Sequence, residues 1–172
     1  IEFRQNDTFQ VSPVILKKER LQELQSHLML FFTGFSRIAS EIAKSQIENI
    51  GDHEIELIRM GAMVDEAIQI LQNTNSPINE FGKLLHQGWQ YKRSLSDKVS
   101  TPEIDFIYDE ALDAGATGGK VLGAGGGGFL LLFVKPEMQS QVRERLKKLV
   151  HVPFEFEDSG SRVVLYQPNG LF

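Results

Sequence analysis

The chain has 172 residues, of which 41% are apolar and 24% charged, and its formal net charge is −5. This composition is typical of a soluble globular protein, and we expect a single domain over residues 1–172. The acidic balance argues against nucleic-acid or anionic-membrane binding, and the lack of cysteine excludes a disulfide scaffold and a thiolate metal site. With no apolar run of membrane length and no leader segment, a cytoplasmic location is expected.

The first half of the chain predicts strands followed by helices. Pro13 favours an edge position for the first strand, and the continuous apolar run before Gly34 is typical of a buried strand. Ser36 is placed to cap the next helix. In chain order the expected elements are an edge strand, a short helix, a buried strand and two helices, which include residues 9–16, 17–25, 28–33, 36–42 and 57–72.

The second half predicts further helices around a strand. Ser76-Pro77 and Thr101-Pro102 are helix-start signals, and Gly115 is placed to end the second of these helices. A buried strand over 129–134, a helix from Pro136 and a closing hairpin follow, the hairpin with arms at 153–157 and 162–166 and a turn at 158–160. This order predicts an α+β fold with an antiparallel sheet covered on one side.

Residues 115–129, GATGGKVLGAGGGGF, hold 8 of the chain's 15 glycines. Each glycine inside an element costs roughly 0.5–1 kcal/mol relative to alanine, so this density favours close approach of the backbone to a ligand. Backbone amides turned into a concavity would bind an anion. A purely structural alternative is a tight connection where a helix packs hard against a sheet.

Two familiar nucleotide motifs do not fit this segment. A dinucleotide fingerprint and a P-loop both run from strand through glycines to helix, whereas the predicted order here is helix, glycines, strand. Lys120 is followed by Val121, where a P-loop has the Ser or Thr that holds magnesium.

The glycine-rich segment resembles the third conserved motif of the GHMP small-molecule kinases. Segments 30–42 and 89–100 resemble the sugar-kinase branch that phosphorylates D-glycero-D-manno-heptose 7-phosphate at its anomeric carbon, with fucokinase-like domains as the nearest relatives. The resemblance implies a ferredoxin-like antiparallel sheet with added helices. It also implies a loop beside the nucleotide's phosphates and the acceptor, made of Gly118, Gly119, Lys120, Gly123, Ala124, Gly125, Gly126, Gly127 and Gly128.

The resemblance also implies that this chain is the C-terminal half of a kinase. The family's ATP-cradling loop, of the type Pro-x-x-x-Gly-x-x-Ser-Ser-Ala, occurs nowhere in these residues. ATP and Mg²⁺ would then be bound mainly by an N-terminal domain that also supplies the general-base aspartate, so no catalytic residue is expected here. The expected partners are that domain and a small-molecule sugar phosphate. The alternatives are another acceptor, such as fucose, or a non-catalytic ferredoxin-like module that binds a phosphorylated metabolite.

Four residues are candidates for acceptor binding. Lys92 and Arg93 would stand on one helix beside Gly88 and Trp89, and could clamp an acceptor's own phosphate; alternatively, their stems only cover apolar surface. Ser36 and Arg37 are expected at a helix start, where an anion can bind, although simple capping by Ser36 is equally consistent. The four histidines lack the spacing of metal ligands, so no metal site is expected.

Overall fold

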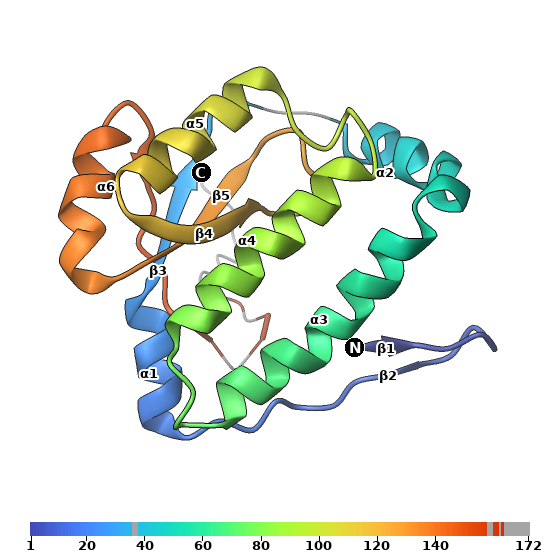
Figure 1. The fold of residues 1–172 in the computed structure, drawn as a ribbon, viewed down its shortest axis with the longest axis horizontal. Helices are drawn as coiled ribbons and strands as arrows, with labels where there is room; N and C mark the ends of the chain where they lie inside the picture. The colour runs from blue at the N-terminus through green and yellow to red at the C-terminus, as the bar shows by residue number, and fades with distance from the viewer. Residues whose placement is uncertain (36–37, 158–159, 162, 164–172) are drawn as a thin grey trace, which may run out of the picture.

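A computed structural model describes residues 1–35, 38–157, 160, 161 and 163 (Figure 1). Strands and a block of consecutive helices are segregated along it as an α+β fold, which confirms the predicted class. The helices are α1 (Lys18–Ser26), α2 (Ala39–Glu48), α3 (Glu54–Gln72), α4 (Asn79–Ser94), α5 (Pro102–Asp113) and α6 (Gln139–Arg145), with short 3₁₀ turns at Ile50–Asp52 and Pro136–Met138. The strands are β1 (Glu2–Phe3), β2 (Phe9–Gln10), β3 (Leu28–Phe32), β4 (Ala116–Val121), β5 (Phe129–Val134) and β6 (Val150–His151).

Four of the strands form one antiparallel sheet in the order β4-β5-β3-β6. Strand β5 is central: it pairs with β3 from Leu28↔Phe133 to Phe32↔Phe129, and with β4 on its other side. Strands β1 and β2 make a separate hairpin, which lies near α3 in Figure 1.

Successive side chains of β5 point to opposite faces of the sheet, and they therefore belong to two separate core clusters. Leu130, Leu132 and Val134 are fully buried on one face, in a cluster that also contains residues of α5 and α6. Phe133 points to the other face and belongs to a smaller cluster with side chains of α1 and of the start of α4. At the far end of this second face Phe129 is 40% exposed. One face is therefore closed and the other is only partly covered.

Helix α4 lies against β4 at a contact that two glycines allow. A Cβ built on Gly118 would lie 2.1 Å from the carbonyl oxygen of Gly82, and one built on Gly82 would lie 2.5 Å from the ring of Phe133. Real side chains do not approach so closely. The helix and the sheet can pack at this separation only because neither position carries a side chain.

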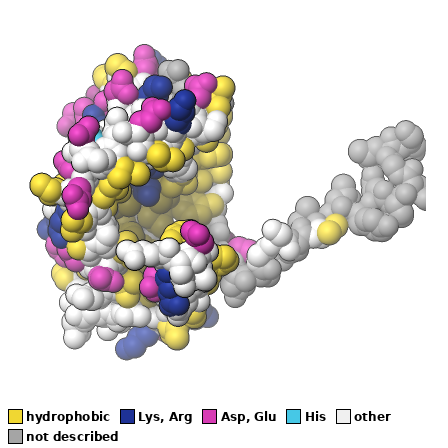
Figure 2. All heavy atoms as spheres, turned by 90° about the vertical axis from the view of Figure 1, so that its right-hand side faces the viewer, with side chains coloured by type: hydrophobic (Ala, Val, Ile, Leu, Met, Phe, Trp, Pro, Cys, Tyr) yellow, Lys and Arg dark blue, Asp and Glu magenta, His cyan; other side chains and the backbone are white. Residues whose placement is uncertain are grey.

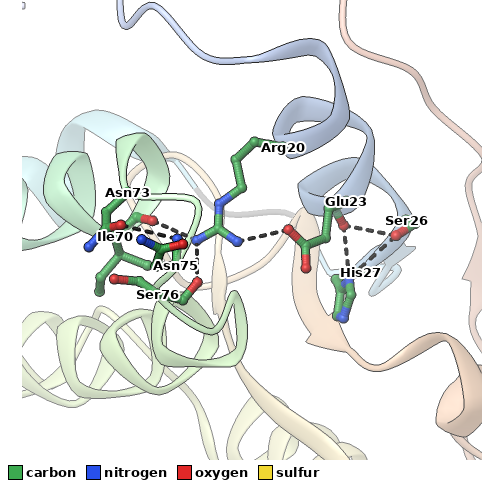
Figure 3. Close-up of polar contacts among 8 residues, drawn as sticks. All are labelled: Arg20, Glu23, Ser26, His27, Ile70, Asn73, Asn75 and Ser76. Atoms are coloured by element: carbon green, nitrogen blue, oxygen red, sulfur yellow. Dashed lines mark hydrogen bonds and ion pairs between the residues drawn. The ribbon is translucent and has the colours of Figure 1, made fainter.

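The buried guanidinium of Arg20 ties α1 to the end of α3 (Figure 3). One terminal nitrogen donates to the carbonyls of Ile70 (2.6 Å) and Ser76 (2.9 Å), and the other forms an ion pair with Glu23 at 2.7 Å. A cation at the C-terminal end of a helix is favourable because the last carbonyls point toward it. Arg20 thus holds the α3–α4 connection in place.

Several sequence-based boundaries change in the structure. Gly118 and Gly119 lie inside strand β4 rather than in a loop, so the order is helix, strand, glycines, strand. The structural alternative stated above, close packing of a helix against the sheet, is therefore enough to explain why position 118 is a glycine. The first arm of the expected hairpin, 153–157, is not a strand. Among the described residues, the last strand paired in the sheet is β6, which ends at His151. Most of the second arm lies outside the described residues.

Other predicted signals hold. The Thr101 hydroxyl accepts from the backbone N–H of Ile104 at 3.3 Å and caps α5, which ends before Gly115. The strands predicted at 28–33 and 129–134 are β3 and β5. Helix α4 begins at Asn79, two residues after the proline expected to open it.

We predict that Gly118→Ala will lower the free energy of unfolding of this chain by about 1–3 kcal/mol, because the new methyl group meets backbone atoms that cannot move away. Urea unfolding monitored by circular dichroism measures the change. Gly61→Ala is the matched control: its Cβ meets nothing within 4 Å inside α3, so it should be neutral or stabilise by about 0.5–1 kcal/mol. Equal stability of Gly118→Ala and the wild-type chain would contradict the packing described here.

Candidate phosphate-binding site

The connection between β4 and β5, residues 122–128, is hereafter the glycine loop. Its glycines hold backbone conformations that other residues rarely adopt: φ is positive at Gly123 (71°), Gly125 (116°), Gly126 (70°), Gly127 (154°) and Gly128 (87°). A run of this kind directs successive peptide groups in ways that a chain with side chains cannot follow. The conformation, and not only the composition, sets this segment apart.

The glycine loop is wedged between two other segments. The amide of Gly126 donates to the carbonyl of Val99, and that of Gly128 to the carbonyl of Phe35, each at 2.8 Å. A Cβ on Gly125 would lie 2.5 Å from the Val99 oxygen, and one on Gly127 would lie 2.6 Å from the Phe35 oxygen. Part of the glycine content is therefore a packing requirement.

The rest of the loop remains available to a ligand. In the described part of the chain, the amides of Gly123 and Ala124 donate to no acceptor, and these two residues are exposed and half-buried, respectively, whereas Gly125 and Gly127 are buried. Gly123 is exposed, and a Cβ added there meets nothing within 4 Å. Amides of this kind in a glycine-rich turn can bind an anion, so the geometry is compatible with the predicted phosphate-proximal role, which stays a prediction.

Two lysines approach the loop from different elements. The ammonium group of Lys92, in the last turn of α4, donates to the carbonyl oxygen of Gly123. Burial and the nearby charge of Lys120 on β4 lower the pKa of Lys92 to about 8. Both effects disfavour the charged form of Lys92, and an anion bound beside it would oppose them by stabilising the ammonium.

Both lysines line a cavity of about 750 Å³ between α3, α4 and the N-terminal hairpin. Its other walls are mainly apolar, including Met63, Leu84 and Trp89. Figure 2 shows the molecule hollowed on this side, with apolar side chains in the hollow and a basic side chain within it. The cationic end of the cavity adjoins the glycine loop, because Lys92 contacts both.

Arg93 does not share this position, although the sequence predicted that Lys92 and Arg93 together clamp a phosphate. Its guanidinium forms an ion pair with Asp105 of α5 at 2.7 Å, and Asp105 also accepts a hydrogen bond from Ser100. Arg93 is not among the residues that line the cavity. Neighbours in sequence on a helix point about 100° apart, so one reaches the cavity and the other reaches α5.

The remaining sequence candidates are placed less completely. Ser36 and Arg37 lie outside the described residues, and their role stays a prediction. Gln46 of α2, which sequence reasoning missed, donates to the carbonyl of Ala124 at 3.1 Å. No local motif signals that contact, since it joins segments 78 residues apart.

The described residues were also searched for metal sites and for membrane-spanning helices. Among residues 1–35, 38–157, 160, 161 and 163, no group of three or more His, Asp or Glu side chains is arranged to hold a metal ion. Within the same residues, none of the helices combines the length and the apolarity needed to cross a bilayer.

The family model for GHMP kinases C-terminal domains matches residues 63–152, just over half of the chain, including α4, β4 and the glycine loop. The chain belongs to the GHMP kinase family. The match covers the contact between α4 and β4 and both lysines of the cavity.

Known relatives place this GHMP kinase domain near the sugar kinases. D-glycero-alpha-D-manno-heptose 7-phosphate kinase from Campylobacter jejuni is 32% identical over 149 residues, 86% of this chain and 44% of that protein. L-fucokinase/L-fucose-1-P guanylyltransferase from Bacteroides fragilis is 33% identical over 124 residues, 68% of this chain and 12% of that protein. The chain therefore spans less than half the length of these curated relatives.

A solved structure agrees in fold. The crystal structure of a D-glycero-D-manno-heptose 1-phosphate kinase from Bacteroides thetaiotaomicron matches 90% of this chain and 40% of that chain, with a TM-score of 0.53 and 27% identity. The α+β architecture described above is thus shared with a solved heptose 1-phosphate kinase over nearly the whole of the chain.

We predict that Lys92 titrates near pH 8 and that Lys120→Met raises its pKa. The increase should stop short of the ordinary value of 10.5, because burial, the larger cause, remains. NMR of the lysine ε-carbons in this chain against pH measures both values. Since the pKa of Lys92 is lower in the folded chain than in the unfolded chain, its contribution to stability should increase as pH rises between about 8 and 10.5. A wild-type midpoint near 10.5 would show that Lys92 is fully hydrated instead.

Proposed function

We propose that this chain is the C-terminal domain of an ATP-dependent kinase that phosphorylates the anomeric hydroxyl of D-glycero-D-manno-heptose 7-phosphate. The observation that carries the proposal is the glycine loop with unbonded amides, set beside the ammonium groups of two lysines. Family membership and the 32% identity to a heptose 7-phosphate kinase support the reaction and the acceptor.

The arrangement suits phosphoryl transfer, which needs positioning and positive potential more than covalent chemistry. The amides of Gly123 and Ala124 would supply positive potential without side-chain bulk, at the side of the nucleotide's terminal phosphates. ATP with Mg²⁺ supplies the phosphoryl group and neutralises charge on its oxygens. The described residues offer amide and ammonium donors, which fit the phosphates, but no acidic cluster that fits the magnesium ion.

An N-terminal domain is the proposed source of the magnesium ligands, the general base and most ATP contacts. The surface next to the glycine loop supports such a partner. The rings of Phe32 and Phe129 contact each other at a tilt, with centroids 5.3 Å apart, and each residue is 40% exposed. Phe35 and Leu122 beside them are similarly exposed. An exposed apolar patch next to the glycine loop is suited to contact with another domain. The relatives, more than twice as long as their matched parts, have room for one.

Fucose is the main alternative acceptor, supported by the 33% identity to a bifunctional fucokinase. Fucose has no phosphate of its own and would leave the lysine pair of the cavity without a ligand. That difference favours the phosphorylated heptose. The alternative from another functional class is a non-catalytic module that binds a phosphorylated metabolite. The enzyme that we propose would instead work in the cytoplasm on a small-molecule acceptor.

The test is an assay of the complete protein that contains this chain, with ATP and Mg²⁺. We expect transfer to heptose 7-phosphate, with ³¹P NMR showing a new anomeric phosphate, and a kcat/KM at least about tenfold higher than for fucose. Faster phosphorylation of fucose would reassign the acceptor. Failure to phosphorylate any sugar, in a protein shown to be folded, would favour the non-catalytic module.

A further inference from the structure

Lys92 and Lys120 form a pair of cations without a counter-ion. In the described part of the chain neither ammonium group is within ion-pair distance of a carboxylate, and the only polar partner of Lys92 is the Gly123 carbonyl. Most lysines of this chain that line no cavity are exposed, and several are paired, as Lys83 is with Glu80. Two like charges held together in a partly buried place are unfavourable unless something anionic binds there.

The surroundings strengthen this imbalance. The charged side chains that line the cavity with Lys92 are Lys120 from β4, Asp65 from α3 and Glu2 from β1, while Arg93, next to Lys92 on α4, points elsewhere. Asp65 and Glu2 line the same cavity but are exposed to solvent, and the causes that shift the pKa of Lys92 include Lys120 and neither carboxylate. Arg93 is neutralised by Asp105. Lys92 and Lys120 are therefore cations at the head of the cavity that no carboxylate pairs with in the described part of the chain.

We propose that Lys92 and Lys120 together bind a phosphomonoester dianion at the head of this cavity, and that in the complete enzyme this group is the phosphate the acceptor already carries. The second part rests on the proposed function. The site replaces the Lys92–Arg93 pair expected from sequence: the second cation comes from a neighbouring strand and not from the next residue of the helix.

The position of the pair suits that role. Lys92 bonds to Gly123, so the cations lie at one edge of the glycine loop. In heptose 7-phosphate the existing phosphate and the anomeric carbon are at opposite ends of the sugar. With its own phosphate at the lysines, the acceptor would extend from there along the glycine loop, so that its anomeric end reaches the transferred phosphoryl group at another part of the loop. Apolar walls around the lysines limit hydration, which strengthens charge-assisted hydrogen bonds to the phosphate oxygens.

The first experiment compares acceptors in the complete kinase. Lys120→Met should lower the preference for heptose 7-phosphate over unphosphorylated heptose, measured as the ratio of the two kcat/KM values, by about tenfold or more. Lys120→Arg keeps the charge and should restore most of the preference. The matched control is Lys83→Met, which removes the same charge from an exposed position of α4 outside the cavity and should leave the preference unchanged.

An equal loss for both acceptors in Lys120→Met would overturn the proposal while the kinase assignment stands, because Lys120 would then serve the transferred phosphoryl group. If the wild-type protein does not phosphorylate heptose 7-phosphate at all, the proposed function fails. The anion site is then judged by the second experiment, which needs no catalysis.

The second experiment uses isothermal titration calorimetry of the complete protein with glycerol 3-phosphate, without ATP. It is run in two buffers of different protonation enthalpy, because the difference in heat gives the number of protons taken up on binding. Near pH 8 the probe is already a dianion, so proton uptake on binding reports Lys92, whose pKa a bound anion raises. We expect uptake of a fraction of a proton, an affinity that falls between pH 8 and 10, and loss of the uptake in Lys92→Met. Binding that is equally strong in Lys120→Met and Lys83→Met, or binding without proton uptake, would overturn the site.

Discussion

The close contact between Gly82 and Gly118 is the constraint on which the rest of the structure depends. The two positions meet backbone to backbone, so α4 rests directly on β4. Any side chain at either position would push the helix away from the sheet. Larger apolar residues elsewhere, such as Phe133 and Tyr108, fill the space around this contact and are fully buried.

The same contact places the cations. Lys120 follows Gly118 by two residues and therefore points from the same face of β4, while Lys92 lies ten residues beyond Gly82, roughly 15 Å along α4. Helix and strand together bring these side chains to one end of the cavity, and Lys92 reaches the glycine loop. Val99 and Phe35 hold the loop from two sides, so its free amides and the cations keep a fixed relation. Packing in the core and charge at the site are thus parts of one arrangement.

Sequence reasoning could predict what depends on local pattern. The start of α5 at Thr101, the buried strand β5 and the GHMP resemblance of residues 115–129 all follow from signals within a few residues. It could not separate Gly118, which serves helix packing, from Gly123, which is open to solvent, because both are glycines in one segment.

The composition of the candidate site also depended on tertiary structure. Sequence grouped Lys92 with Arg93 because helical spacing puts them beside Gly88 and Trp89, but the sequence does not show that Asp105 of the next helix pairs with Arg93. The partner of Lys92 is Lys120, 28 residues away, and only the position of β4 beside α4 brings the two together. Local sequence motifs carry no information about the proximity of these two lysines.

A crystal structure of the complete protein with heptose 7-phosphate and a non-hydrolysable ATP analogue tests the central claim most directly. The account predicts that the acceptor's phosphate lies within about 3 Å of the ammonium nitrogens of Lys92 and Lys120. The terminal phosphate of the nucleotide should face the amides of the glycine loop in the same crystal. An acceptor phosphate held by another domain, with both lysines left in solvent, would contradict the account.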